Sequence, residues 1–475
     1  MRIVFAASEA VPFSKTGGLG DVVSGLSKAL VKKGQKVSVF LPFYLKTKWT
    51  VLDNYQFVDS FEVAMGSRMV RANILKDVKN GVTFYFVENG AYFERENFYS
   101  YPDDEERFSF FSQAVKKAIL RLNLRPQIVH VHDWQTAIVP LLLADAGLKF
   151  RSLLTIHNPA FQGYFNPYNL GSYLNLAQYY YDSGLIKFNN QVSLLKGGIT
   201  TCDAISTVSI THAKELISDY KSFNGLGYIL HNREKDLFGI VNGIDYQAFD
   251  PSKDKLIPQD YSYKNYKTGK KKNKKALLEA FGLTNTDLDR PIFSIVSRLT
   301  NQKGIDRVLR NIENIVKQDA ILLVLGQGEN EIEQALKHYS ELYPNNIKIY
   351  LGYNEVLSHL VYAGSDFFLM PSKFEPCGLG QIIAMHYGTL PLVSKVGGLN
   401  DTVISYYENS AKATGLSFAN WDENCFDYSI YLLSKMYKEK DPILEQMILR
   451  AMKVNFSWSR QVNKYIELYK ELLKR

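Results

Sequence analysis

Short apolar runs rich in β-branched and aromatic residues alternate with helical patterns along both halves of the chain. This alternation is typical of parallel sheets that are covered by helices on both faces. Amphipathic stretches such as 20–33 and 107–122 are expected to be helices between the strands. The predicted strands are 3–7, 36–41, 82–87, 128–132, 152–156 and 204–208 in the first half, and 292–297, 320–325, 347–351, 366–370 and 390–394 in the second.

The pattern therefore predicts two open α/β domains of the doubly wound, Rossmann-like kind. A length of 475 residues suits two domains. The polar stretch 249–290 contains no clear strand, so we place the domain crossing near its start. The expected domains are 1–246 and 247–456, and a final amphipathic helix within 457–475 is expected to pack back on the first domain.

The net charge of +8 comes almost entirely from one segment. Seven lysines fall within residues 264–275, and without them the net charge is +1. We interpret this run as a solvated loop and helix start rather than a nucleic-acid site. A hydrophobic content of 46% excludes disorder as the dominant state. No membrane span or signal peptide is expected, and three scattered cysteines fit neither disulfides nor zinc, so we expect a cytoplasmic protein.

Loops that follow strands are the expected ligand sites, because open α/β sheets bind ligands beyond the carboxyl ends of their strands. The loop after the first strand carries Lys15, Gly17, Gly18 and Gly20 and opens a helix. Glycine N–H groups and a helix N-terminus suit a phosphate, to which the lysine adds a full charge. The spacing matches neither G-x-G-x-x-G nor the P-loop motif. A tight turn without a ligand remains the alternative.

In the second half, Arg298 and Lys303 lie five residues apart in one loop and could grip a pyrophosphate together. A pair of surface cations is the alternative. After a later strand, Glu375 precedes Cys377, Gly378 and a helix start. This carboxylate could accept hydrogen bonds from sugar hydroxyls, while the N–H groups after it face phosphate.

Polar side chains also end two strands of the first half, at His130-Val131-His132-Asp133-Trp134 and at His157-Asn158. Hydroxyl-binding groups beside one indole face suit a sugar. We expect His130 and His132 to point to opposite faces of their strand and so to form a poor metal pair. Asp287 and Asp289 resemble a metal-binding D-x-D motif but precede a strand, where no ligand is expected, so no metal site is predicted.

The motifs together resemble the family of bacterial glycogen synthases and plant starch synthases, which are retaining glucosyltransferases. The resemblance covers nearly the whole chain and rests on motifs that fall in the family's order. They are Lys15-Thr16-Gly17-Gly18-Leu19-Gly20-Asp21-Val22, His132-Asp133-Trp134, His157-Asn158, Val241-Asn242-Gly243-Ile244-Asp245, Ser297-Arg298-Leu299, Gln302-Lys303-Gly304 and Glu375-Pro376-Cys377-Gly378-Leu379.

The resemblance implies the GT-B architecture, in which two such domains face each other across a deep cleft. It also implies a role for each site residue. The residues that would hold the pyrophosphate are Lys15, Gly18, Arg298 and Lys303, and those that would hold the transferred glucose are His157, Asn242, Glu375 and the backbone of Cys377, Gly378 and Leu379. Gly17 and Asp21 would shape the pocket, and Tyr353 would stack on the base. The residues that would contact the acceptor are Asp133, Trp134 and Tyr92. Arg298, Lys303, Glu375 and His157 form the expected catalytic set.

The implied reaction transfers glucose from ADP-glucose to the non-reducing-end 4-hydroxyl of an α-1,4-glucan such as glycogen, with retention and without cofactor or metal. UDP-glucose as donor, another acceptor, a pyridoxal phosphate-dependent phosphorylase and a non-catalytic sugar-binding regulator remain alternatives. We expect no nucleic-acid or membrane partner, and the oligomeric state is open. Glu375 and Asp21 are the candidate nucleophiles if transfer is a double displacement. We instead interpret Glu375 as a ligand of sugar hydroxyls. We expect the acceptor to attack the glucose on the same face from which the leaving group departs.

Overall fold

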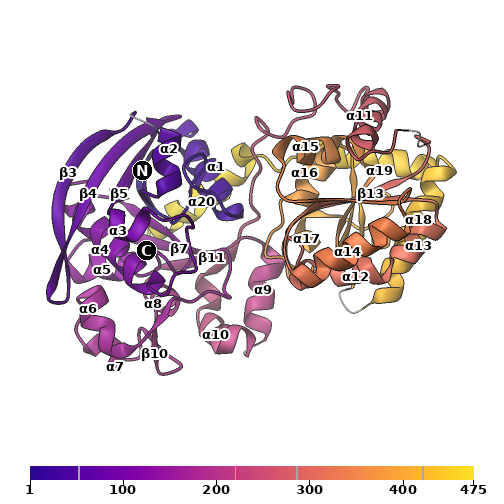
Figure 1. Cartoon of the computed structure of the whole chain (residues 1–475). Helices are drawn as coiled ribbons and strands as arrows, with labels where there is room; N and C mark the ends of the chain where they lie inside the picture. Colours follow the sequence, from indigo (N-terminus) through magenta and orange to yellow (C-terminus); the bar gives the residue numbers. More distant parts are fainter. Residues whose placement is uncertain (52–53, 220, 285–286, 420–421) are drawn as a thin grey trace. The chain divides into compact units, whose positions relative to one another are not determined.

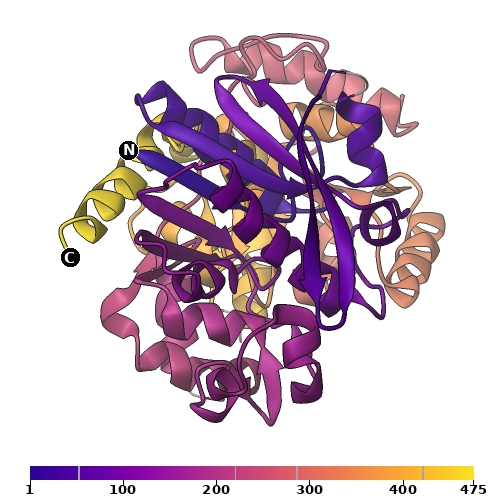
Figure 2. The ribbon, with the colours of Figure 1, turned by 90° about the vertical axis from the view of Figure 1, so that its left-hand side faces the viewer.

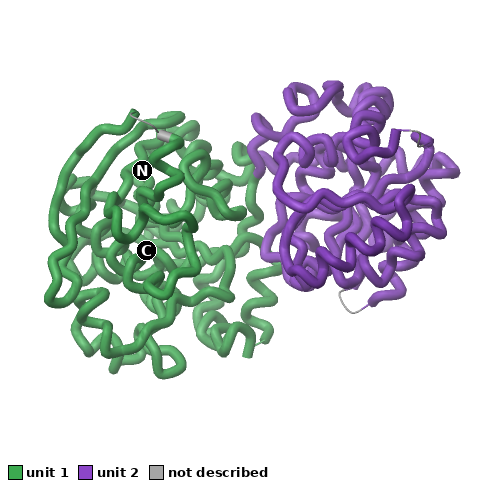
Figure 3. Tube along the Cα trace, in the orientation of Figure 1, with its two compact units in different colours: residues 1–243, 458–475 green, residues 244–457 purple. Residues whose placement is uncertain are grey.

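The chain forms two compact units, each built on its own sheet (Figures 1 and 3). The computed structural model describes residues 1–51, 54–219, 221–284, 287–419 and 422–475. Unit 1 comprises Met1–Gly243 and Trp458–Arg475, and unit 2 comprises Ile244–Ser457. The main sheet of unit 1 is largely parallel and that of unit 2 is wholly parallel, so the predicted α/β class is confirmed.

Unit 1 contains a nine-stranded sheet in the order β12-β11-β7-β6-β1-β2-β5-β4-β3. The strands from β12 to β5 are parallel, whereas β4 and β3 form an antiparallel hairpin at one edge (Figure 2). The sequence prediction missed this hairpin and the short β12. The bounds are β1 (Arg2–Ala6), β2 (Lys36–Pro42), β3 (Gln56–Met65), β4 (Arg68–Lys79), β5 (Val82–Glu88), β6 (Ile128–His132), β7 (Arg151–Ile156), β11 (Ala204–Thr207) and β12 (Leu237–Gly239).

Helices and one small sheet complete unit 1. The helices are α1 (Gly18–Lys32), α2 (Leu45–Val51), α3 (Gly90–Phe93), α4 (Asp104–Arg121), α5 (Val139–Asp145), α6 (Leu170–Leu174), α7 (Tyr179–Asp182), α8 (Leu194–Thr201), α9 (Ile210–Ser218), α10 (Ser222–His231) and α20 (Trp458–Leu472). The small antiparallel sheet joins β8 (Tyr164–Phe165), β10 (Gln191–Ser193) and β9 (Lys187–Phe188). Helix α20 packs on α1 so closely that a Cβ on Gly25 would lie 2.0 Å from Nε1 of Trp458. Only glycine fits at this crossing.

Unit 2 contains a six-stranded, wholly parallel sheet in the order β15-β14-β13-β16-β17-β18. Its strands are β13 (Ile292–Val296), β14 (Ile321–Gly326), β15 (Ile347–Leu351), β16 (Phe367–Met370), β17 (Leu390–Ser394) and β18 (Leu416–Phe418). Its helices are α11 (Tyr266–Ala280), α12 (Ile305–Arg310), α13 (Ile312–Lys317), α14 (Asn330–Leu342), α15 (Glu355–Gly364), α16 (Gly380–His386), α17 (Gly397–Thr402), α18 (Glu423–Lys438) and α19 (Pro442–Lys453). None of the helices in the described ranges has the length and apolar character needed to cross a bilayer.

The lysine run forms most of α11, and the expectation that it is simply solvated is wrong for two of its members. Lys270 is buried, and its ammonium donates to the carbonyls of Ala363 and Tyr387 and to Oγ1 of Thr389, at 2.7 to 3.2 Å. Burial lowers the pKa of Lys270 to about 7. Lys274, also buried, forms an ion pair of 2.7 Å with Asp366. These two lysines therefore anchor α11 to unit 2, while the other five in the run are exposed.

Candidate active site

In unit 2 the predicted residues lie in loops that leave the carboxyl ends of neighbouring parallel strands. Arg298 and Lys303 follow β13, whereas Glu375, Cys377, Gly378 and Leu379 follow β16. The two loops touch, because a Cβ on Gly304 would lie 1.9 Å from the carbonyl oxygen of Pro371. Gly304 also has a φ of 71°, a backbone conformation that residues with a side chain rarely adopt. Glycine here lets the two chemistry-bearing loops approach each other.

The structure pairs Lys303 directly with Glu375. The lysine Nζ lies 2.6 Å from Oε2 of the glutamate, which also accepts from Oγ of Ser372 at 3.1 Å. Both side chains are largely buried, at 17% and 8% exposed. Sequence reasoning assigned these residues to separate parts of a ligand and did not foresee the ion pair. Each charge orients the other at the edge of the sheet.

The loop after β16 is also held by the glycines that begin α17. Gly398 donates its N–H to the carbonyl of Glu375 at 3.1 Å, and a Cβ on it would lie 2.2 Å from the carbonyl of Cys377. Gly378 has a φ of 70°, and α16 then begins at Gly380 without a side-chain cap. The backbone N–H groups at this turn can therefore donate to an anion.

Arg298 and Tyr353 are the exposed members of the unit 2 group. Arg298 makes no ion pair or side-chain hydrogen bond to any other described residue, so its guanidinium is open to a ligand. Tyr353 follows β15 and is 76% exposed, which suits stacking on a flat ring. The Asp287 and Asp289 pair lies before β13, at the opposite end of that strand, and Asp287 accepts from the backbone N–H of Asp289. No group of metal-ligating side chains occurs among the residues the structure describes.

In unit 1, the loop between β1 and α1 carries Lys15. Nζ of Lys15 lies 2.9 Å from Oδ1 of Asp21, and both side chains are partly exposed. The loop is fixed from beneath by Glu9, which is 2% exposed and accepts from the N–H and the hydroxyl of Thr16 at 2.5 and 2.6 Å. Tyr99 donates to the same carboxylate at 2.7 Å. Sequence reasoning missed Glu9 and Tyr99; a glutamate shortly after the predicted first strand was the available signal for Glu9.

Three histidines meet at the carboxyl ends of β6 and β7. The expectation that His130 and His132 point to opposite faces is wrong, because residues two apart in a strand share a face. Their ring centroids lie 4.2 Å apart. His132 Nδ1 lies 3.1 Å from Nε2 of His157, whereas His130 bonds Tyr469 and Thr155. Burial lowers the pKa of His157 to about 3 and those of the other two well below the usual range. All three rings are therefore neutral near pH 7.

Asp133 is buried beside these rings and has a φ of 56°, a strained conformation for a non-glycine residue. Its Oδ1 accepts from the backbone N–H groups of His157 and Asn158 at 2.7 and 3.3 Å. Burial raises the pKa of this carboxyl to about 7, although the two backbone donors partly offset the effect. Asp133 thus sets the position of the loop that carries His157.

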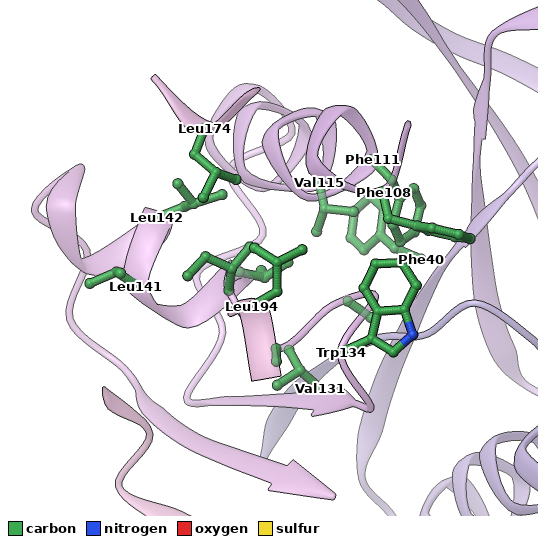
Figure 4. Close-up of a cluster of buried hydrophobic side chains, with 14 of the residues drawn as sticks. Phe40, Phe108, Phe111, Val115, Val131, Trp134, Leu141, Leu142, Leu174 and Leu194 are labelled. Atoms are coloured by element: carbon green, nitrogen blue, oxygen red, sulfur yellow. The ribbon is translucent and has the colours of Figure 1, made fainter. Parts of the chain in front are cut away.

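Trp134 and Tyr92 are not presented as sugar-binding faces. The indole is 7% exposed and packs edge-on against Phe108 in the core of unit 1 (Figure 4). A Cβ on Gly163 would lie 2.3 Å from the same indole. The Tyr92 ring is equally buried, and its hydroxyl donates to Glu106 at 2.6 Å. Large aromatic rings gain most by burial, so the structure corrects the expectation of an open indole face.

Asn242 lies in the last loop of unit 1 and is 4% exposed. Its Oδ1 has no hydrogen-bond partner within the described ranges. A buried amide oxygen without a protein partner can accept a hydrogen bond from a ligand or a water. The neighbouring Gly243 packs against Trp458, where a Cβ would lie 2.7 Å from the indole.

Because these three histidines are neutral in the folded chain, we predict that acid destabilises unit 1. Below about pH 6.5 the unfolded chain protonates its imidazoles while the folded chain keeps these three neutral, so the free energy of unfolding falls as pH falls. Asp133 opposes them, because it holds a proton up to about pH 7 only when folded. Replacing His132 by phenylalanine should therefore reduce the slope by about 1.4 kcal/mol per pH unit between about pH 5 and 6. Urea unfolding across this window measures the slope, and equal slopes in both proteins would contradict the assignment.

Two family descriptions match the chain. Residues 2–232 match the starch synthase catalytic domain, and residues 271–440 match the glycosyl transferases of group 1. Among curated proteins, a glycogen synthase from Bacillus cereus is 41% identical over 100% of both chains, and one from Lactococcus lactis is 40% identical over 99% of this chain and 100% of its own.

Solved structures show the same relationship. The catalytic domain of starch synthase IV from Arabidopsis thaliana, bound to ADP and acarbose, is 31% identical with a TM-score of 0.90, covering 100% of this chain and 99% of that one. A sucrose-phosphate synthase from Thermosynechococcus elongatus, 17% identical with a TM-score of 0.62 over 100% of both chains, shares the fold. The matches span both units and all the motif loops. The chain therefore belongs to the glycogen and starch synthase family of glycosyltransferases, with the two-sheet GT-B type of fold.

Proposed function

We propose that the protein transfers glucose from ADP-glucose to the non-reducing-end 4-hydroxyl of an α-1,4-glucan such as glycogen, with retention of configuration. The full-length similarity to bacterial glycogen synthases carries this proposal. The ADP in the solved starch synthase IV structure supports the choice of donor. The cations and N–H groups described above supply the chemistry that a departing nucleotide diphosphate needs.

We further propose that different parts of the chain bind different substrates. Residues 1–246 would hold the acceptor and offer the Lys15 loop, residues 247–456 would hold the nucleotide, and the segment 457–475 would belong with the first part. Helix α20 supports the last point, since it packs on α1 within unit 1. In this scheme Tyr353 stacks on the base, and Asp21, Gly17 and Gly18 shape the pocket.

Glucosyl transfer builds positive charge on the anomeric carbon and negative charge on the leaving diphosphate. In our proposal Arg298, Lys303 and Lys15 stabilise that negative charge, with the N–H groups of Cys377, Gly378 and Leu379 assisting. Glu375, oriented by Lys303, accepts from hydroxyls of the transferred glucose, and His157 and Asn242 hold its other side. The acceptor hydroxyl then attacks the anomeric carbon on the same face of the glucose from which the diphosphate departs.

The alternatives differ in donor or in chemistry. UDP-glucose would use the same diphosphate-binding groups, so the donor must be tested directly. A non-catalytic sugar-binding regulator would not need a cation cluster, whereas Arg298, Lys303 and Lys15 are all present. The cytoplasmic location stays a prediction from sequence, as does the absence of nucleic-acid and membrane partners.

The decisive assay incubates the protein with glycogen and either labelled ADP-glucose or labelled UDP-glucose, and measures label in the polymer. We expect label chiefly from ADP-glucose, and the same rate after exhaustive treatment with chelator, because all proposed phosphate ligands are protein groups. Label from UDP-glucose alone would reassign the donor. Loss of activity with chelator and recovery with magnesium or manganese would show that a metal takes part.

Asp133→Asn provides a separate test of the acceptor side. If Asp133 lies toward the glucan, the variant should raise the KM for glycogen more than the KM for ADP-glucose. Both backbone hydrogen bonds go to Oδ1, and the amide oxygen of asparagine can still accept them, so His157 keeps its position. A fall in kcat with both KM values unchanged would instead assign Asp133 to holding His157.

A further inference from the structure

We infer that His132 is a positioning residue that holds His157 as its Nδ1–H tautomer, so that His157 offers an N–H donor at Nδ1 rather than a bare nitrogen. The contact between Nδ1 of His132 and Nε2 of His157, at 3.1 Å, is the starting observation. Two neutral imidazoles that share one hydrogen bond contain one proton between these two nitrogens. The position of that proton decides what His157 presents to a ligand.

The buried nitrogen on the far side of His132 decides between the two arrangements. Nε2 of His132 is buried and has no hydrogen-bond partner in the part of the chain that the structure describes. If His157 donated from its Nε2, neutral His132 would have to carry its own proton on its Nε2, which would then be a buried N–H with no acceptor. If His132 donates from Nδ1, its Nε2 is only an unused acceptor. Buried N–H groups without a partner are rarer than buried acceptors without one, so His132 is the donor.

Both partners of this hydrogen bond are fixed in place. The His132 ring lies against His130 at 4.2 Å and edge-on to Phe5 at 5.3 Å, and its backbone N–H donates to Oγ1 of Thr136 at 2.9 Å. His157 is held at its backbone by Asp133, as described above, and at its ring by His132. The adjacent residues His132 and Asp133 therefore hold two different parts of the same histidine.

The consequence for a ligand is specific. His157 is half-buried, and its Nδ1 makes no hydrogen bond to any described residue. With a proton on Nδ1, the ring donates to an oxygen, such as that of a sugar hydroxyl, and cannot accept from one at that position. The tautomer assignment rests on the structure alone, whereas its kinetic effect rests on the proposed function.

The tautomer can be measured without any substrate. The chain has eight histidines, so ¹⁵N-histidine labelling with long-range ¹H–¹⁵N spectra gives few signals, and loss of one signal set in His157→Asn assigns that ring. We expect a protonated Nδ1 and a bare Nε2 for His157 in the wild type. A protonated Nε2 would overturn the inference, whatever the activity of the enzyme.

Kinetics of matched variants test the positioning role. His132→Phe keeps a ring but removes the donor, and we expect kcat to fall about tenfold to a hundredfold, the scale seen when a residue that orients a ligating histidine is lost. His132→Asn places an amide N–H near the position of Nδ1 and should recover most of that loss. His338→Asn, on the exposed face of α14, is the control and should leave kcat unchanged.

The outcomes separate the possibilities. Equal losses in His132→Phe and His132→Asn, with melting temperatures near wild type, would show that the donor does not matter and would overturn the positioning role. An inactive wild type with the expected tautomer would contradict the proposed function and leave the tautomer assignment standing. If His132→Phe fails to fold, the wild-type spectrum and His132→Asn still decide.

Discussion

Arg298→Ala and Lys303→Ala are each expected to lower kcat about a hundredfold to a thousandfold, the scale for removing one preorganised group from developing charge. The two variants should differ in stability. Arg298 is exposed and makes no ion pair with any described residue, so its loss should change the free energy of unfolding by less than about 0.5 kcal/mol. Lys303→Ala leaves the buried Glu375 carboxylate unpaired, and should cost about 1 to 3 kcal/mol, since Lys303 is itself partly open to solvent.

Turnover and urea unfolding of the same preparations check both parts. Lys373→Ala is the matched control, because Lys373 lies in the same loop as Glu375 but forms a partly exposed ion pair with Asp306 at 2.9 Å. It should keep near-normal kcat. Near-normal turnover in both Arg298→Ala and Lys303→Ala would place the diphosphate site elsewhere.

Glu375→Gln is expected to leave a weak but measurable enzyme that still retains the α-configuration. Glutamine keeps the shape and can accept from a sugar hydroxyl, but it cannot act as a nucleophile. It also replaces the charged partner of Lys303 by a neutral one across the 2.6 Å contact. If Glu375 orients the glucose, the loss of transition-state stabilisation should be about 2 to 4 kcal/mol.

A nucleophilic Glu375 would behave differently. The glutamine variant would be nearly inert, and azide would restore turnover as a β-glucosyl azide, because the small anion would occupy the vacant face. Mass spectrometry of the Glu375 peptide with a slow acceptor provides the complementary measurement. A trapped glucosyl adduct, or the azide product, would overturn same-face attack.

Parallel strands were the most predictable part of the fold, because buried strands read as continuous apolar runs such as Ile292–Val296. The β3–β4 hairpin was missed, although two alternating segments separated by Gly66 and Ser67 were a usable signal. Its strands have one face partly exposed, so their apolar positions are interrupted by charged ones. The error about His130 and His132 came from misapplying the two-residue period of a strand, not from any feature of the structure.

The two α/β halves, the family, and the loops that carry Lys15, Arg298, Lys303 and Glu375 could be predicted from the sequence, because motif spacing and apolar periodicity are local properties of the chain. Which side chains meet depends on how distant parts of the chain fold together. The Lys303–Glu375 pair joins residues 72 positions apart, and the hydrogen bond between His132 and His157 joins residues 25 apart. Burial likewise depends on packing from several elements at once. For this reason Trp134 lies in the core, although it was expected to face a sugar, and Lys270 is buried, although the lysine run was expected to be solvated.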